Sequence, residues 1–220
     1  EAEGNVKKTQ LRYNGNIVYN PIKDLTLSAV FSYIRDNMNR GYGETLNHIS
    51  ALRDGLAGWS SVGAYTKMEK LMELTAQYNK EIGAHKFSVL GGYSYNETDF
   101  EELWIDNYGF QDDYFGGWHN IGIGSALKDG KANIGSKKTP TNLIGFFGRA
   151  TYSFKNRYLL MGALRYEGAS QLWGTDNAWG LFPSISVGWR ITEEAFMKNQ
   201  KIFDDLKLRA SYGLTGNFRI

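Results

Sequence analysis

The sequence predicts an all-β chain, an antiparallel transmembrane β-barrel segment of about eight strands. Apolar residues alternate with polar ones along eight stretches, which is the pattern of strands that each have one apolar face. Short turns and long polar segments alternate between these stretches, as they do in membrane barrels. Each of the eight stretches is expected to have roughly 9 to 13 residues, against about 9 to 11 for a tilted strand that crosses a bilayer.

Two hairpins with short turns are predicted in the first half of the chain. In each, apolar side chains recur at every second position, and turn-forming residues separate the two strands. Long polar segments at 35–64 and 97–141 follow the first and the second hairpin. The four strands are expected, in order, at about 9–20, 25–33, 74–78 and 85–95.

The third hairpin, at 142–166, has the clearest alternation. Its two strands are joined by a very short polar connection, Lys155 to Arg157. One face of the hairpin is apolar, whereas the other carries Arg149, Thr151 and Arg165 and suits a wet interior. The apolar face consists of Ile144, Phe146, Gly148, Ala150, Tyr152, Phe154, Tyr158, Leu160, Gly162, Leu164 and Tyr166.

The last two strands are expected at about 181–191 and 206–212, after a third long segment at 167–178. Between them, Thr192 is expected to cap one short helical turn, because Glu193 and Glu194 follow it near the positive end of such a turn. In a membrane barrel the three long segments would face outside and the short turns would face the periplasm.

Aromatic residues gather near both ends of the candidate strands, where two interfacial girdles are expected. Aromatic residues also favour strands in any sheet, so this pattern alone is also consistent with a soluble β protein. The residues near the short turns are Tyr19, Tyr78, Phe154, Tyr158 and Trp189, and those near the long segments are Tyr33, Tyr95, Tyr166 and Trp179.

Composition sets limits on the class. The 220 residues are 15% aromatic and include 26 glycines, three prolines and no cysteine, which fits a β-rich chain without disulfides. The net charge of +2 gives no electrostatic case for binding nucleic acid. The first eight residues lack the features of a secretory signal, so we expect either that the signal was removed or that the chain is a fragment.

Three stretches carry a family resemblance: FGRATYSFKNRYLL with LRYEGAS at 147–170, WGLFPSISVGWRITEEAFM at 179–197, and DDLKLRASYGLTGN at 204–217. They resemble the barrel of SusC/RagA-type TonB-linked outer-membrane proteins. Upstream, Tyr19-Asn20-Pro21 and Gly91-Gly92-Tyr93 are weaker matches. The resemblance is therefore firm from Asn142 onward.

The resemblance implies that residues 1–220 form part of a larger barrel of about 22 strands in the outer membrane. It implies import of oligosaccharides or peptides, without enzymatic activity, and leaves the cargo open. The implied partners are a SusD-like surface lipoprotein, the TonB–ExbB–ExbD complex and outer-membrane lipid. A plug domain and a TonB box are not recognised in this chain, which is expected to be unable to insert alone because both sheet edges would be unpaired.

The long segment from Glu97 to Thr141 is the predicted place for ligand or partner contacts. It combines aromatic rings, which stack on sugar rings or peptide side chains, with carboxylates that accept hydrogen bonds. A segment of this length also needs an aromatic core of its own, and we favour loop ordering or partner packing over direct ligand binding. The candidate residues are Trp104, Tyr108, Phe110, Asp112, Asp113, Tyr114 and Trp118.

No catalytic, cofactor or metal site is predicted. His48, His85 and His119 are widely separated and lack ligand spacing. The adjacent carboxylates Glu101-Glu102 and Asp112-Asp113 could bind calcium, but we interpret them as solvated loop charges.

Two other readings stay open at the level of sequence. The chain could be a small, complete eight-stranded outer-membrane barrel with a structural or adhesive role, in which the first strand pairs with the last. It could also be a soluble β-rich module that binds carbohydrate, although its apolar, aromatic outward face argues against solubility.

Overall fold

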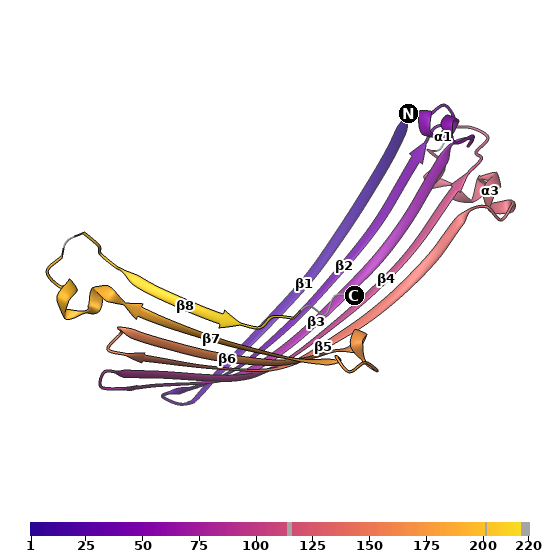
Figure 1. Ribbon diagram of the computed structural model, residues 1–220. Coiled ribbons are helices and arrows are strands. Elements are labelled where there is room, and N and C mark those ends of the chain that lie inside the picture. The colour runs from indigo at the N-terminus through magenta and orange to yellow at the C-terminus, as the bar shows by residue number, and fades with distance from the viewer. Residues whose placement is uncertain (114–115, 201, 217–220) are drawn as a thin grey trace. The chain divides into compact units, whose positions relative to one another are not determined.

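The computed structural model describes residues 1–113, 116–200 and 202–216, which form one antiparallel sheet of eight strands (Figure 1). The strands are hydrogen-bonded in chain order from β1 to β8, and no ladder joins β1 to β8 among these residues. The sheet is therefore not closed. The strands are β1 (Ala2–Ile22), β2 (Leu25–Glu44), β3 (Trp59–Ile82), β4 (His85–Tyr108), β5 (Asn133–Phe154), β6 (Tyr158–Ala169), β7 (Trp179–Arg190) and β8 (Lys207–Gly213).

The chain folds as two compact units. Unit 1 comprises Glu1–Tyr13, Tyr33–Glu69 and Thr98–Pro140, and unit 2 comprises Asn14–Ser32, Lys70–Glu97 and the described residues after Pro140. Unit 1 thus contains the first two long connections, and unit 2 contains the short turns.

In unit 2, the predicted third hairpin is present with its predicted connection. The β5–β6 ladder extends from Leu143 opposite Ala169 to Phe154 opposite Tyr158. Lys155 and Asn156 have φ values of 53° and 52°, and the amide of Arg157 donates a 2.9 Å hydrogen bond to the carbonyl of Phe154. Two consecutive positive φ angles make a type I′ turn, whose twist matches that of a hairpin.

The first five strands, which run through both units, are longer than predicted. β1 to β5 have 21, 20, 24, 24 and 22 residues, so the expected lengths of roughly 9 to 13 residues are wrong for them. The sheet continues through polar sequence such as Asp36–Arg40 and Thr98–Glu102, where cross-strand hydrogen bonds do not depend on an apolar face. An apolar alternation therefore marks only part of each strand.

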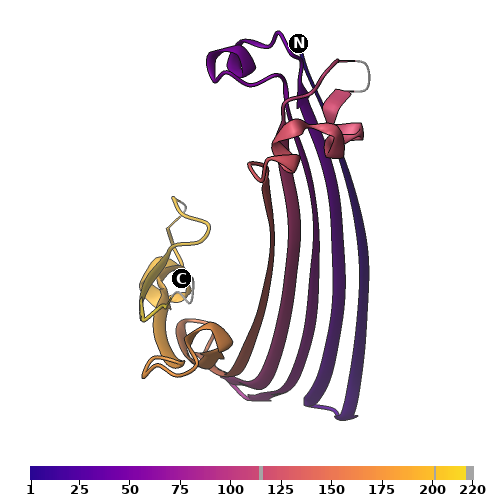
Figure 2. The same cartoon turned by 90° about the vertical axis from the view of Figure 1, so that its right-hand side faces the viewer.

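The long connections are correspondingly shorter than predicted. Only 45–58, 109–132 and 170–178 connect the strands, in place of 35–64, 97–141 and 167–178. In unit 1, the first two contain short helices and lie at the same end of the strands (Figure 2). These helices are α1 (Ile49–Arg53), α2 (Gly116–His119), η1 (Ile121–Ile123) and α3 (Ser125–Lys128), and η2 (Ser170–Leu172) lies in the third connection.

The connection between β7 and β8, at 191–206, contains two 3₁₀ turns, η3 (Ile191–Glu193) and η4 (Ala195–Met197). Thr192 lies inside η3 and does not cap it, so the predicted cap is wrong. The Thr192 hydroxyl instead donates to Asp205 at 3.2 Å. The described residues contain no helix long and apolar enough to span a membrane.

Candidate functional site

The β4–β5 connection of unit 1 is organised around Asn107, the fully buried residue before the end of β4. Its side-chain amide donates to the carbonyls of Ile121 at 2.6 Å and Gly124 at 3.1 Å. A Cβ at Gly124 would lie 2.5 Å from that amide nitrogen, so glycine permits the close approach. Asn107 therefore stabilises the connection. The sequence alone does not reveal this role, because the bonded carbonyls lie 14 and 17 residues further along the chain.

Phe110, a predicted contact residue, also has a structural role. Its side chain is 6% exposed, and its amide donates a 2.7 Å hydrogen bond to the carbonyl of Ala57 in the neighbouring connection. A Cβ at Gly58 would lie 3.4 Å from the Phe110 ring. Phe110 therefore joins the second connection to the first.

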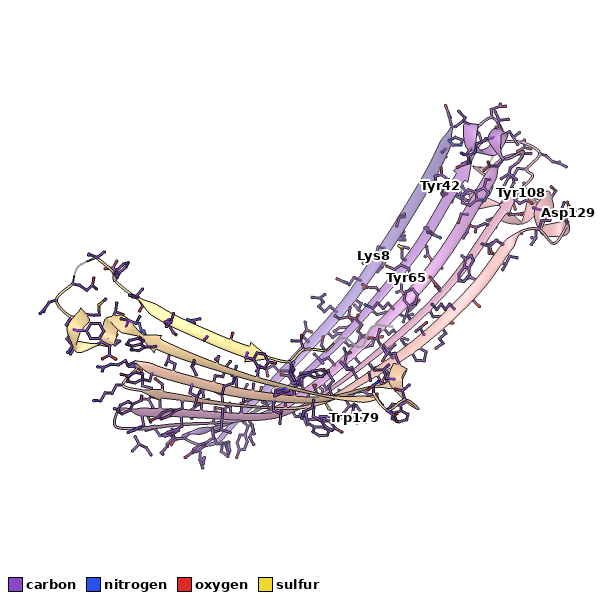
Figure 3. The ribbon with its side chains drawn as sticks, viewed as in Figure 1. Lys8, Tyr42, Tyr65, Tyr108, Asp129 and Trp179 are labelled. Atoms are coloured by element: carbon purple, nitrogen blue, oxygen red, sulfur yellow. The ribbon has the colours of Figure 1, made fainter. Side chains whose placement is uncertain are left out.

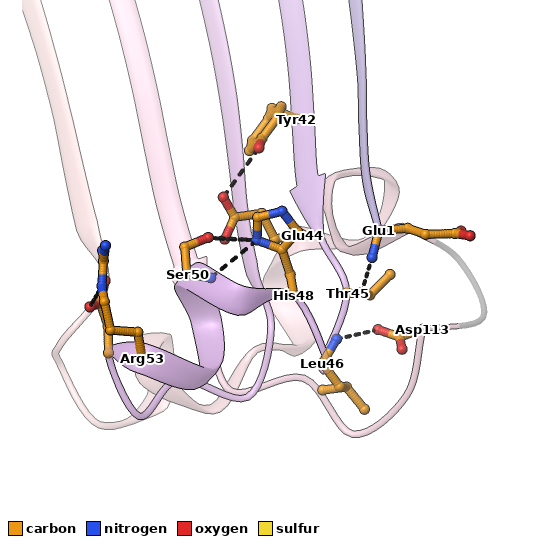
Figure 4. A network of polar contacts seen from close by, with 10 residues as sticks. Glu1, Tyr42, Glu44, Thr45, Leu46, His48, Ser50, Arg53 and Asp113 are labelled. Atoms are coloured by element: carbon orange, nitrogen blue, oxygen red, sulfur yellow. Dashed lines mark hydrogen bonds and ion pairs between the residues drawn. The ribbon is translucent and has the colours of Figure 1, made fainter.

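Asp113 joins the two connections, since one of its carboxylate oxygens accepts a 2.8 Å hydrogen bond from the amide of Leu46 (Figure 4). In the same region Glu44 accepts from Ser50 at 2.6 Å and from Tyr42 at 3.1 Å, and His48 contacts the Ser50 hydroxyl at 2.5 Å. These contacts hold α1 against the end of β2.

The other predicted residues lie in different environments. Asp112 is exposed, and Tyr108 is the last residue of β4 (Figure 3). Tyr114 lies outside the described residues. Within the described ranges, no group of three or more histidine, aspartate or glutamate side chains is arranged to hold a metal ion.

The strands of unit 1 have two faces with different contacts. We call one the Gly63 face, because Arg40 of β2 lies over Gly63 of β3 there. We call the other the Gly41 face, after the glycine of β2 that follows Arg40 and therefore points to the opposite side.

The two predicted tryptophans lie on opposite faces. A Cβ at Gly41 would lie 2.0 Å from the Trp118 ring, so Trp118 packs on the Gly41 face. A Cβ at Gly135 of β5 would lie 2.1 Å from the Trp104 ring, and alternation along β4 places Trp104 with Phe100, whose ring is 5.6 Å from that of Tyr65 on the Gly63 face. The predicted aromatic group is therefore divided.

Alternation also separates the adjacent carboxylates of β4. Glu101 lies 3.7 Å from the ammonium of Lys138, whereas Glu102 points to the other face. Glu102 and Trp104 line a cavity of about 400 Å³ on the Gly63 face. Its other side-chain walls come from Met38, Arg40, Tyr65, Asp106 and Asn133.

Unit 2 has an apolar, exposed face. Phe146, Leu160, Leu164 and Ile185 are 50%, 45%, 48% and 53% exposed, although each lies in the interior of a strand. An exposed apolar surface of this extent marks a contact with lipid or protein.

The other face of unit 2 is polar and hollowed by a cavity of about 780 Å³. Its walls include Lys86, Thr151, Ser153, Lys207 and Arg209. Lys86 pairs with Glu81 at 3.2 Å, whereas Lys207 and Arg209 form no ion pair with the described residues. The cavity wall is therefore partly cationic.

Comparison with protein families decides the classification. The family model described as TonB dependent receptor-like, beta-barrel matches residues 2–218. The chain belongs to the TonB-dependent receptor β-barrel family. The resemblance read from the sequence and the predicted all-β fold, as part of a larger barrel, are thereby confirmed.

Relatives of this receptor chain are much longer. TonB-dependent receptor P26 of Formosa agariphila is 34% identical over 203 residues, which are 91% of this chain and 20% of that protein. TonB-dependent receptor SusC of Bacteroides thetaiotaomicron is 34% identical over 164 residues, which are 74% of this chain and 15% of SusC. The chain thus spans about a fifth or less of the length of these relatives.

The fold matches a solved structure, "Structure of the RagAB peptide transporter", with a TM-score of 0.81 and 24% identity. The match covers all of this chain and 24% of the matched chain. At this identity the match supports the fold, and the open sheet is the expected form of one segment of a closed barrel.

Proposed function

We propose that this chain forms part of the wall and outer loops of an outer-membrane importer of nutrients, oligosaccharides or peptides. The observation that carries the proposal is the exposed apolar face of unit 2 in a chain of the TonB-dependent receptor family. In a barrel such a face contacts lipid, and only alternate residues need to be apolar.

The spacing of two aromatic pairs on unit 2 supports a lipid-facing band. Phe154 and Tyr158 lie near the short turn, with ring centroids 6.5 Å apart, and Tyr166 stacks on Trp179 at 4.8 Å near the other end of β6. Eight residue steps separate Tyr158 from Tyr166, which is about 27 Å along a strand. A tilt of roughly 35–45° reduces this to about 20 Å, close to the roughly 25 Å apolar band of such barrels.

The remainder of the receptor, outside residues 1–220, would supply the plug and the TonB box in this proposal. The polar, hollowed face of unit 2 suits contact with a plug inside the barrel. Energy would come from the TonB–ExbB–ExbD complex through the plug, and this chain would have no catalytic role.

A SusD-like lipoprotein is the proposed partner at the outer end. Similarity to SusC and to the fold of the RagAB peptide transporter supports this choice. In unit 1, α1 exposes Ile49 and Leu52, at 80% and 60%, beside the strand ends. Such side chains suit a protein contact better than water.

An immunoblot of fractionated native membranes tests the proposal. The antibody is raised against residues 118–132, within the second connection of unit 1. We expect a band several times larger than 24.8 kDa in the outer-membrane fraction. A band near 24.8 kDa would favour the small complete barrel, and a reactive soluble protein would favour the carbohydrate-binding module.

A transport assay then tests import itself. Deletion of the full-length gene should abolish growth on one class of polymer or peptide, and the intact gene should restore it. A deletion strain that grows like the parent on every oligosaccharide and peptide supplied would contradict the role in import.

A further inference from the structure

Arg40, Gly63 and Trp104 form a row across three neighbouring strands of unit 1. Arg40 on β2 lies over Gly63 on β3, since a Cβ at Gly63 would be 2.7 Å from the Arg40 Nε. Trp104 lies level with Gly63 on β4, because the Phe110 amide bonds to the Ala57 carbonyl and Lys70 pairs with Glu97, which set one register. Glu102 is the next residue on that face and lies level with Tyr65. Gly63 therefore leaves room for the Arg40 side chain beside the strand that carries Trp104 and Glu102.

The two charged side chains lack partners within the described part of the chain. Neither Arg40 nor Glu102 forms a hydrogen bond or ion pair there, although both line the same cavity. The Arg40 side chain reaches over Gly63 on β3, the strand next to the one that carries Glu102. The cavity thus contains both a planar group of donors and a carboxylate acceptor.

Trp104 adds an aromatic wall to the same cavity. One side of its ring is held against Gly135, so the indole is fixed on the sheet. Trp104 follows Glu102 on the same face of β4, roughly 7 Å away along the strand. A ligand that stacks on this indole can therefore also reach the Glu102 carboxylate.

Asp106 extends the polar side of the cavity. The Asn133 side-chain amide donates a 2.8 Å hydrogen bond to one of its carboxylate oxygens and orients the group. The other oxygen of Asp106 and the side-chain carbonyl of Asn133 can still accept hydrogen bonds. The volume of about 400 Å³ lies within the range of small-ligand sites, roughly 300–1,000 Å³.

We propose that this cavity is a subsite for a neutral oligosaccharide, with one sugar ring stacked on Trp104 and its hydroxyl groups bound by Arg40 and Glu102. The inference rests on the proposed import function and selects glycan over peptide as the ligand class. A pyranose has an apolar face that stacks on an indole and hydroxyls that both donate and accept hydrogen bonds.

A peptide fits this cavity less well. Apolar side chains of a peptide would need apolar pockets, whereas Arg40, Glu102, Asp106 and Asn133 supply polar walls here. Trp118, which packs on Gly41 on the other face, has no place in the proposed subsite.

Binding to the purified full-length receptor, measured by calorimetry in detergent, tests the subsite. The probes are maltohexaose, cellohexaose, xylohexaose and the peptide pentaalanine with free ends. We expect one of the hexasaccharides to bind, and Trp104→Ala and Glu102→Gln each to weaken that binding about tenfold. Glu101→Gln, on the opposite face of β4, is the matched control and should leave the affinity within twofold.

Three results would overturn the subsite. These are unchanged affinity in Trp104→Ala, binding of pentaalanine in preference to every hexasaccharide, and no binding of any hexasaccharide. The outer-membrane immunoblot and the growth assay are read in the same strains. If the Trp104→Ala and Glu102→Gln strains grew normally on a glycan and kept wild-type affinity, the subsite would be refuted but import would not. Absence of the reactive band from the outer-membrane fraction would refute import itself.

Discussion

The hydroxyl of Tyr158 donates a 2.7 Å hydrogen bond to Glu194 and so joins the first residue of β6 to the β7–β8 connection. Glu194 also accepts from the Trp189 indole at 3.0 Å and from Arg157 at 2.8 Å. One carboxylate thus links the β5–β6 turn, the end of β7 and the turn η4 that follows it. This explains how the connection at 191–206 keeps a defined structure despite its length.

Replacing Glu194 by glutamine should loosen this connection, because a neutral amide is a weaker acceptor and loses the attraction of Arg157. We expect amide hydrogen exchange across 191–206 in the full-length receptor to become several-fold faster, with little change elsewhere. Glu193→Gln is the matched control, since Glu193 is exposed and its side chain has no partner within the described residues. Equal exchange in the two variants would rule out this role for Glu194.

The same contacts predict a dependence on pH. The hydrogen bonds from Tyr158 and then from Trp189, with the charge of Arg157, hold the pKa of Glu194 below its ordinary value of 4.5. Because the folded pKa is lowered, the stabilisation is present above pH 4.5 and is lost as the pH falls through the lowered value. Tryptophan fluorescence of the wild type should change in that acidic window, and a titration that persists in Glu194→Gln would contradict the assignment.

Asn107→Ala should release the β4–β5 connection. The substitution leaves the carbonyls of Ile121 and Gly124 without their donor, which costs about 2 kcal/mol when such groups are buried. We expect faster proteolysis within 109–132. Asn120→Ala is the control in the same connection, because Asn120 is exposed and makes no side-chain cap. Cleavage of both variants at the wild-type rate would show that Asn107 does not order the loop.

Gly41→Ala should displace Trp118. The new Cβ would lie 2.0 Å from the indole, too close for any side-chain contact, and the ring would have to leave the Gly41 face. Quenching of tryptophan fluorescence by iodide should rise. Gly122→Ala has nothing within 4 Å of the added carbon and should leave quenching unchanged. If Gly41→Ala behaves like Gly122→Ala, Trp118 does not pack on Gly41.

The fold was predictable wherever one strand face is apolar. The alternation from Tyr158 to Tyr166 gave the correct faces and the correct turn at Lys155 and Asn156. The parts of β1 to β5 that lie far from the short turns were missed. Residues there, such as Thr98–Glu102, are polar on both strand faces, so apolar residues do not recur at every second position. The prediction that the chain is part of a larger barrel came from the family resemblance of the stretches after Asn142.

The candidate site was only partly predictable. Trp104 and Asp106 belonged to the segment expected to contain contacts, but Arg40 and Gly63 come from strands far away in sequence. Their proximity depends on register, which a polar strand does not reveal. Trp104 and Trp118 were grouped because 97–141 was treated as one loop. In the structure Trp104 belongs to β4 and lies on the Gly63 face, whereas Trp118 belongs to the following connection and packs on the Gly41 face.

The odd–even order along β4 also limits how this wall can change during evolution. Deleting one residue of β4 before Glu101 would exchange the sides of Glu101 and Glu102 and turn the Glu102 carboxylate toward Lys138. Insertions and deletions among relatives should therefore accumulate after Tyr108, in the connection, while the strand keeps its length. Diversification of cargo would then proceed by substitution in the wall and by length variation in the loops.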